Sequence, residues 1–415
     1  MTITIAPEVL RSSARTPIDP LTDGRESCSR LLSTDAARAA LAREGTPLML
    51  LDLAPVRRCY RRLRAALPRV RFHYAVKALS HDAVIAALGD EGCSFDIATA
   101  QELHQVLRAG ISHTRVIHTH PIKKPSEIAE ALRRGVRMFV VDNESEIDKF
   151  TGAPPDTRLL IRLAYRSPSA KSDLSGKFGV SGAEASELLG HAQRRGIRIA
   201  GFSYHVGSQL DDPGRFARAL TDTLDLMERL EKTAAARFDT LDIGGGFPVA
   251  YDEQVRPLED FAGVLAPILD ERARHLDVIA EPGRILVADA MSLVTSVVGI
   301  ADRDDGRWYY IDDGVYGSYS NIVAEDVHPL VFGVDEVLQD EEPVAQAGNT
   351  RRRVTLGGPT CDSADVIARV VPLPDLRVGD LLVSPAMGAY TSVTATTFNG
   401  RPVTPIVVIG GQTVP

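Results

Sequence analysis

The sequence predicts an α/β protein built from a TIM-type (β/α)8 barrel and a β-rich C-terminal domain. Eight short apolar runs follow one another between residues 70 and 281, and segments of helical composition lie between them. Glycine closes four of these segments at positions typical of a helix C-cap, Gly92, Gly110, Gly135 and Gly196. After residue 285 turns replace the helices between apolar runs, which indicates a second domain of β type.

The apolar runs are the predicted barrel strands. They cover residues 70–76, 94–97, 116–118, 138–141, 159–163, 201–204, 240–243 and 278–281. The predicted helices include residues 82–92, 98–110, 125–135, 183–196, 213–236 and 258–275. This alternation is typical of parallel β-α-β units, and eight runs favour a closed barrel over an open doubly wound sheet.

The rest of the chain is expected to form the β domain, an N-terminal tail and a loop. Residues 285–303, 308–312, 352–356, 380–385 and 402–408 have strand composition, and the strand-like residues 46–53 could join them. We therefore expect a barrel over 54–285 and a discontinuous β domain over 31–53 plus 286–415. Residues 1–30, rich in Ser, Thr, Arg and Pro, are expected to be a disordered tail, and the acidic residues 335–346 a solvated loop.

The composition of the chain indicates which partners and which cellular compartment to expect. The net charge of -8 does not favour a nucleic-acid partner, and the apolar runs are too short to span a membrane. The four cysteines lie far apart without a C-x-x-C pair. We therefore expect neither a disulfide framework nor a metal site, and we predict a cytoplasmic protein.

Residues that can carry chemistry stand where the predicted barrel strands end. They are Lys77 after the first strand, Asp96 in the second, His205 after the sixth, Gly244 to Gly246 after the seventh, and Glu281 with Arg284 at the eighth. In a (β/α)8 barrel these strand ends meet on one face. An amine, a flat ring, a glycine loop, a carboxylate and a guanidinium on one rim match the needs of pyridoxal phosphate.

Each of these residues alone has a plainer explanation. Lys77 could be a solvated strand end, the three glycines a flexible hinge, and Glu281 with Arg284 a surface pair. If Lys77 is instead desolvated in a pocket, we expect its pKa to fall and its amine to become a nucleophile. Their coincidence on one rim favours the cofactor site.

Six motifs carry a resemblance to a known family. They occupy residues 74–77, 204–208, 241–248, 281–284, 313–318 and 358–362. In this order and spacing they resemble the ornithine decarboxylase branch of the fold-type III pyridoxal-phosphate decarboxylases, over about residues 45 to 410.

The resemblance implies a role for each cofactor-binding residue. Lys77 would hold pyridoxal phosphate covalently, His205 would stack on its ring, and Asp96 and Arg162 would lie beside it. The phosphate would be held by Gly244, Gly245, Gly246, Gly283, Arg284, Ser208 and Tyr390. Glu281 would contact the pyridine nitrogen and keep it protonated, which favours decarboxylation over racemisation.

The resemblance also implies a homodimer with active sites at its interface. Cys361, supplied by the partner subunit, would protonate the α-carbon. Asp326 and Asp362 would bind the distal ammonium of a small cationic substrate. Glu325 departs from the family pattern, because relatives of the eukaryotic type have tyrosine there; it could face the substrate or the solvent.

The function implied is decarboxylation of a basic L-amino acid, with L-ornithine the first candidate and putrescine and CO2 the products. Lysine, arginine or a specialised diamino acid are alternatives. Diaminopimelate is a further one, which Ser208-Gln209 favours and Asp362 opposes. A pseudo-enzyme of the antizyme-inhibitor kind is the non-enzyme alternative. The presence of Lys77 and Cys361 argues against it.

Overall fold

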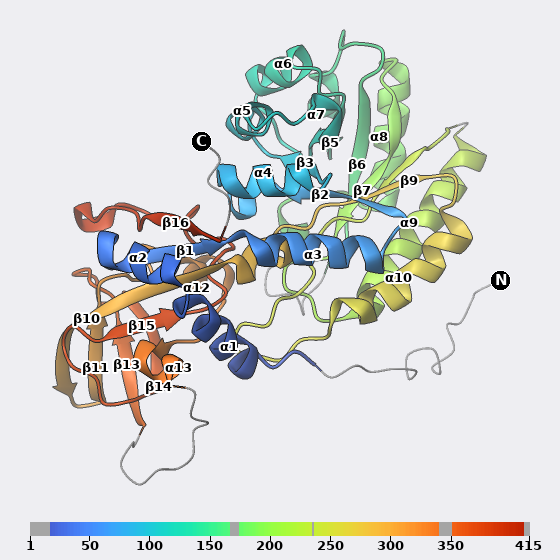
Figure 1. Ribbon diagram of the computed structural model, residues 1–415. Coiled ribbons are helices and arrows are strands. Elements are labelled where there is room, and N and C mark those ends of the chain that lie inside the picture. Colours follow the sequence, from blue (N-terminus) through green and yellow to red (C-terminus); the bar gives the residue numbers. More distant parts are fainter. Residues whose placement is uncertain (1–16, 167–173, 235, 340–350, 411–415) are drawn as a thin grey trace.

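A closed barrel of eight parallel strands forms one body of the molecule (Figure 1). Its strands are β2 (Val70–Ala75), β3 (Ser94–Ile97), β4 (Val116–His118), β5 (Met138–Val141), β6 (Arg158–Ala164), β7 (Ile199–His205), β8 (Thr240–Asp242) and β9 (Asp277–Ala280). Each strand pairs with the next, and β9 closes on β2 with Val278 opposite Val70. The predicted barrel is therefore confirmed. The computed structural model describes residues 17–166, 174–234, 236–339 and 351–410.

Two apolar layers hold the barrel together. Small and medium side chains fill its interior, among them Ile117, Met138 and Val140. Alternate residues such as Phe139 and Val141 point outward and pack beneath the helices. Strands buried on both faces read as continuous apolar runs, which is why short sequence segments such as 138–141 matched the observed strand so closely.

Helices cover the outside of the barrel. They are α3 (Leu53–Ala66), α4 (Asp82–Asp90), α5 (Ala100–Arg108), α6 (Pro125–Arg133), α7 (Glu144–Asp148), α8 (Gly182–Arg194), α9 (Pro213–Thr233) and α10 (Leu258–Arg272). Gly92, Gly110, Gly135 and Gly196 all have positive φ after helices, as C-terminal caps require. Short 3₁₀ helices lie at Val76–Ala78, His113–Arg115, Leu174–Gly176, Ala288–Ala290 and Phe398–Gly400.

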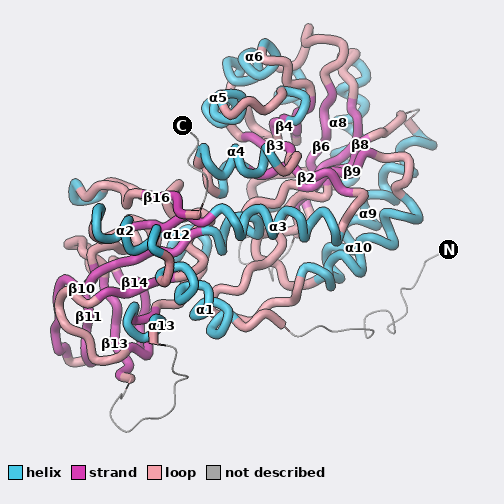
Figure 2. Tube along the Cα trace, in the orientation of Figure 1, coloured by secondary structure: helices cyan, strands magenta, loops and turns pink. Residues whose placement is uncertain are grey.

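The second body is a mixed sheet (Figure 2). It contains β10 (Met291–Arg303), β11 (Gly306–Ile311), β12 (Phe332–Gly333), β13 (Arg352–Gly357), β14 (Val366–Leu373) and β15 (Leu381–Ser384). Strand β1 (Leu48–Asp52) pairs with β10 and with β16 (Ile406–Ile409). The N-terminal strand therefore joins the C-terminal sheet, as expected.

Several local expectations are wrong. Helix α1 (Pro20–Leu32) occupies much of the predicted disordered tail, because Asp19 caps it and Cys28 and Leu32 pack into a buried cluster. Helix α2 (Asp35–Glu44) follows it. The first part of the predicted strand 285–303 is instead α11 (Arg284–Val287), since a short apolar run alone does not distinguish helix from strand.

The C-terminal half also holds elements that the sequence pattern did not indicate. Helix α12 (Ser320–Glu325) precedes β12, and helix α13 (Val334–Leu338) covers the first residues of the segment 335–346 that was expected to be a solvated loop. Residues 1–16 and 340–350, on which the remainder of the tail and loop predictions fall, lie outside the described residues. In the described ranges, no helix is long and apolar enough to cross a membrane.

Candidate active site

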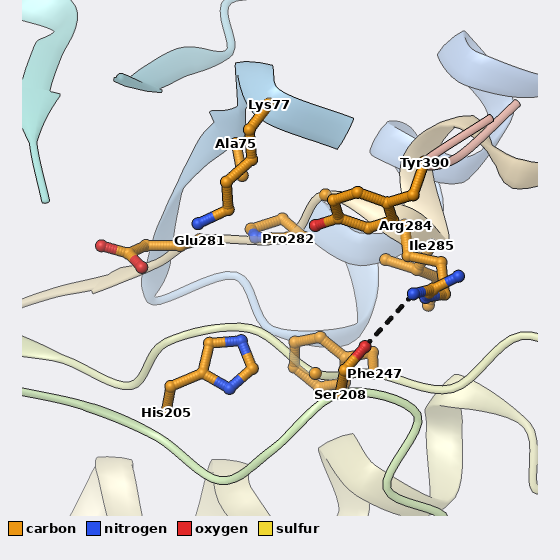
Figure 3. A pocket seen from close by; sticks show the side chains of 12 residues that line it. Ala75, Lys77, His205, Ser208, Phe247, Glu281, Pro282, Arg284, Ile285 and Tyr390 are labelled. Carbon is orange, nitrogen blue, oxygen red and sulfur yellow. Dashed lines mark hydrogen bonds between the residues drawn. The ribbon is translucent and has the colours of Figure 1, made fainter. Parts of the chain in front are cut away.

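A pocket opens where the barrel strands end (Figure 3). Its lining combines an amine, an imidazole, a carboxylate and a guanidinium with apolar and small residues. The lining residues are Ala75, Lys77, His205, Ser208, Gly246, Phe247, Glu281, Pro282, Gly283, Arg284, Ile285 and Tyr390. The structure thus brings together most of the residues that the sequence assigned to the cofactor.

Lys77 lies in the 3₁₀ turn directly after β2, and its Nζ is 3.9 Å from Oδ2 of Asp96. Asp96 is buried and accepts a hydrogen bond from the hydroxyl of Thr119. Burial lowers the pKa of Lys77, but the carboxyl groups of Asp96 and Glu281 and the Tyr390 phenol outweigh it and raise the pKa above its usual value. The expectation of a lowered pKa for Lys77 is therefore wrong in the unloaded protein.

Glu281 follows β9 and is buried with its Oε1 bonded to no group in the described part of the chain. Burial, and then the neighbouring Asp242, raise the pKa of Glu281 well above its usual range. Burial likewise raises the pKa of Asp242 to about 6. A buried acid with an unpartnered oxygen is costly unless a ligand supplies the missing partner.

His205 and Arg162 complete the ring side of the site. Burial, Arg162 and Lys77 lower the pKa of His205 well below its usual value, so its imidazole is neutral. The Nδ1 of His205 accepts the Gly207 amide at 3.1 Å, which holds the ring in place. Arg162, in β6, lies with its guanidinium 5.5 Å from the centre of the Phe178 ring, and it is absent from the residues that line the pocket.

The three glycines after β8 lie against the backbones of neighbouring strand ends. A Cβ on Gly244 would stand 2.1 Å from the carbonyl oxygen of Tyr204, and one on Gly245 2.5 Å from that of Glu281. Gly244 and Gly246 have φ values of +68° and +98°. This packing leaves no room for a flexible hinge. Within the described chain the amides of Gly245 and Gly246 donate to no group, so they are available to an anion.

Replacing Gly246 with alanine is expected to lower the free energy of unfolding by about 1–3 kcal/mol, because the added methyl would lie 2.1 Å from the Gly207 carbonyl oxygen. Urea unfolding of the unloaded protein measures this. Gly263→Ala is the matched control, since its Cβ meets nothing within 4 Å in helix α10. The control should gain up to about 1 kcal/mol. A Gly246→Ala protein as stable as wild type would contradict the packing argument.

Arg284 is the cation at the other end of the pocket. It is 5% exposed, and its Nη1 donates to the hydroxyl of Tyr251 at 3.0 Å and its Nη2 to that of Ser208 at 3.3 Å. Its guanidinium lies 4.8 Å from the centre of the Tyr390 ring. Tyr390 comes from the β domain, and its amide donates to the carbonyl of Ala78 beside Lys77. Sequence reasoning missed Tyr251, although it follows the glycine loop by only five residues.

Glu325 faces neither of the directions considered from the sequence. Its Oε2 accepts a hydrogen bond from Arg284 Nη2 at 2.6 Å and lies 3.5 Å from the Ser208 hydroxyl. It is therefore bonded to two of the three side chains expected to hold a phosphate.

The residues assigned to proton transfer and to the distal ammonium do not line the pocket. Asp326 is 71% exposed and lies 3.3 Å from Nε2 of His328. Cys361 is exposed, with its amide bonded to Asn399, and Asp362 accepts the hydroxyl of Tyr316. The pocket of a single chain thus lacks the thiol and the two aspartates that the sequence assigned to proton transfer and to the substrate.

The chemistry of the pocket fits pyridoxal phosphate. The free glycine amides and Arg284 could bind its phosphate, and the neutral His205 could stack on its ring. The unpartnered oxygen of Glu281 could pair with its pyridine nitrogen. The fold and the site together define a barrel-type pyridoxal phosphate enzyme.

Comparison with known proteins narrows this class. The pyridoxal binding domain of the pyridoxal-dependent decarboxylases matches residues 53–288. The chain belongs to this family and is a pyridoxal phosphate-dependent decarboxylase.

Individual relatives are similar to this chain over most of its length. The chain is 35% identical to antizyme inhibitor 2 of Xenopus laevis, over 86% of this chain and 79% of that protein. It is 34% identical to the lysine/ornithine decarboxylase of Selenomonas ruminantium, over 92% and 94% of the two chains. The structure of a lysine/ornithine decarboxylase complexed with putrescine from Vibrio vulnificus is similar, with a TM-score of 0.82 and 40% identity, over 90% of this chain and 96% of that one.

Proposed function

We propose that the protein decarboxylates a basic L-amino acid, with L-ornithine as the leading substrate and putrescine and CO2 as products. The observation that carries this proposal is one pocket that holds both Lys77 and the buried Glu281, whose Oε1 has no partner in the described chain. The similar proteins of Selenomonas ruminantium and Vibrio vulnificus, both lysine/ornithine decarboxylases, support a diamino acid as substrate. A diamine product would place the enzyme in polyamine formation.

The side chains of the pocket have separable roles in this reaction. Pyridoxal phosphate, when bound, accepts the electron pair left on the α-carbon as CO2 departs. Burial raises the pKa of Glu281 and so favours its protonated form, which could share its proton with the pyridine nitrogen. The neutral His205 offers a flat, uncharged ring face. Lys77 would anchor the cofactor, and the neighbouring Asp96 stabilises the ammonium form of the free Lys77 side chain.

We further propose a homodimer in which each subunit completes the other's site. The support is the position of Cys361, exposed on the β domain and absent from the pocket of its own chain. Cys361 of the partner subunit would donate the proton to the α-carbon after CO2 leaves. Asp362 of the partner subunit and Asp326, which directly follows the pocket-facing Glu325, would meet the distal ammonium.

The compartment we propose is the cytoplasm. Cys28, Cys59, Cys93 and Cys361 are all free thiols. Burial raises the pKa of the first three to about 12, so they are inert, and a reducing environment suits an exposed Cys361 with a catalytic role.

The substrate is tested by measuring CO2 release from ornithine, lysine, arginine and diaminopimelate with the cofactor-loaded protein. We expect ornithine to be fastest and lysine second. A preference for diaminopimelate would overturn the roles given to Asp326 and Asp362. If the protein releases CO2 from none of the four, the non-enzyme alternative is favoured. The similarity to antizyme inhibitor 2 is compatible with that alternative.

A further inference from the structure

Helix α12 places a carboxylate against Arg284 and Ser208, two residues at the anion-binding end of the pocket. The helix ends at Glu325, and Asp326 follows in the left-handed conformation with a φ of +51°. This turn leaves Asp326 exposed and directs Glu325 inward, where its side chain is only 21% exposed. The turn therefore directs two adjacent acidic side chains apart: Asp326 faces solvent, and Glu325 lies against Arg284.

The partners of Glu325 are the groups assigned to the phosphate. Its carboxylate takes the shortest bond that Arg284 makes, 2.6 Å, and lies near the Ser208 hydroxyl. Among the described residues that line the pocket, Arg284 and Lys77 are the cationic ones, and Lys77 lies beside Asp96. The charge of Arg284 is thus already neutralised by the protein itself.

We propose that Glu325 occupies the phosphate subsite of the unloaded protein, so that pyridoxal phosphate binds by displacing the Glu325 carboxylate from Arg284 and Ser208. This inference rests on the proposed function. A carboxylate and a phosphate are both strong acceptors for a guanidinium, and as like charges they repel at this distance. Cofactor affinity is therefore set by an exchange of anions, and Glu325 is the residue that weakens it.

The test compares the affinities of wild type and Glu325→Gln for pyridoxal phosphate and for pyridoxal, which has the same ring and aldehyde but no phosphate. Binding is followed by the visible absorbance of the cofactor on Lys77. We expect pyridoxal phosphate to bind about 10-fold more tightly to Glu325→Gln, and pyridoxal to bind both proteins equally. Glu253→Gln, which removes an exposed acid of equal charge that lines no part of the pocket, should match wild type with both compounds.

Three results would overturn the inference. They are unchanged binding of pyridoxal phosphate to Glu325→Gln, weaker binding, or equal tightening for pyridoxal. Glu325→Ala serves as a second variant, with the same expected direction. If neither wild type nor variant develops the visible band, the proposed function fails instead. Calorimetric titration with inorganic phosphate then still decides the inference, since Glu325→Gln should bind phosphate more tightly than wild type.

Discussion

Replacing Lys77 with alanine should reduce decarboxylation by about 10³-fold or more, because the cofactor loses its covalent anchor. Lys77 lines the pocket that also holds Glu281 and Arg284, with its Nζ 3.9 Å from Asp96. The loss should appear in two measurements, CO2 release and the visible absorbance of bound pyridoxal phosphate. Borohydride reduction of the loaded wild-type protein should fix the cofactor on Lys77.

Lys232→Ala is the control for this change, since Lys232 is an exposed lysine near the end of helix α9, outside the pocket. It should retain both activity and absorbance. Lys77→Arg keeps the positive charge beside Asp96 and should nevertheless be as inactive as the alanine variant. An unchanged visible band in Lys77→Ala would show that the anchor lies elsewhere.

Cys361→Ala should reduce putrescine formation by about 10²-fold or more, because the α-carbon loses its proton donor. Mixing this variant with Lys77→Ala should restore activity to about a quarter of wild type. Random pairing gives half heterodimers, and each of these regains one intact site of two. Dissociating and reassociating the two purified variants together, followed by an ornithine assay, measures the gain.

Recovery of activity in the mixture is expected only if each site takes Lys77 from one subunit and Cys361 from the other. In the proposed heterodimer one pocket would combine Lys77 with Cys361 of the partner subunit, and the other would lack both. If Lys77 and Cys361 acted from the same chain, no pocket would be intact and the mixture would stay inactive. That outcome would contradict the shared site and the homodimer with it.

Much of the barrel could be predicted from the sequence because its determinants are local. Residues 94–97, 116–118 and 138–141 coincide with β3, β4 and β5, since strands buried on both faces are apolar throughout. At residues 285–287 an apolar run led to a wrong prediction of a strand. There the run forms helix α11 between barrel and sheet, and only its position in the fold shows this.

The site was predicted less completely, because its electrostatics depend on contacts between distant segments. The direction of the Lys77 pKa is set by Asp96 and Tyr390, which lie on other elements. The inward direction of Glu325 depends on where α12 lies relative to Arg284, 41 residues away in the chain. Spacing in the sequence carries no information on either. The strand-end rule could place Lys77, His205 and Glu281 on one rim, because a closed barrel fixes that topology.

The contact between Tyr390 and the barrel rim bears on how the enzyme matures. Tyr390 bonds the chain beside Lys77 and lies against Arg284, yet it follows all eight barrel strands in the sequence. The phosphate end of the barrel is therefore complete only when the segment that carries Tyr390 has docked on the rim. We expect retention of the cofactor to depend on this docking as well as on the barrel itself.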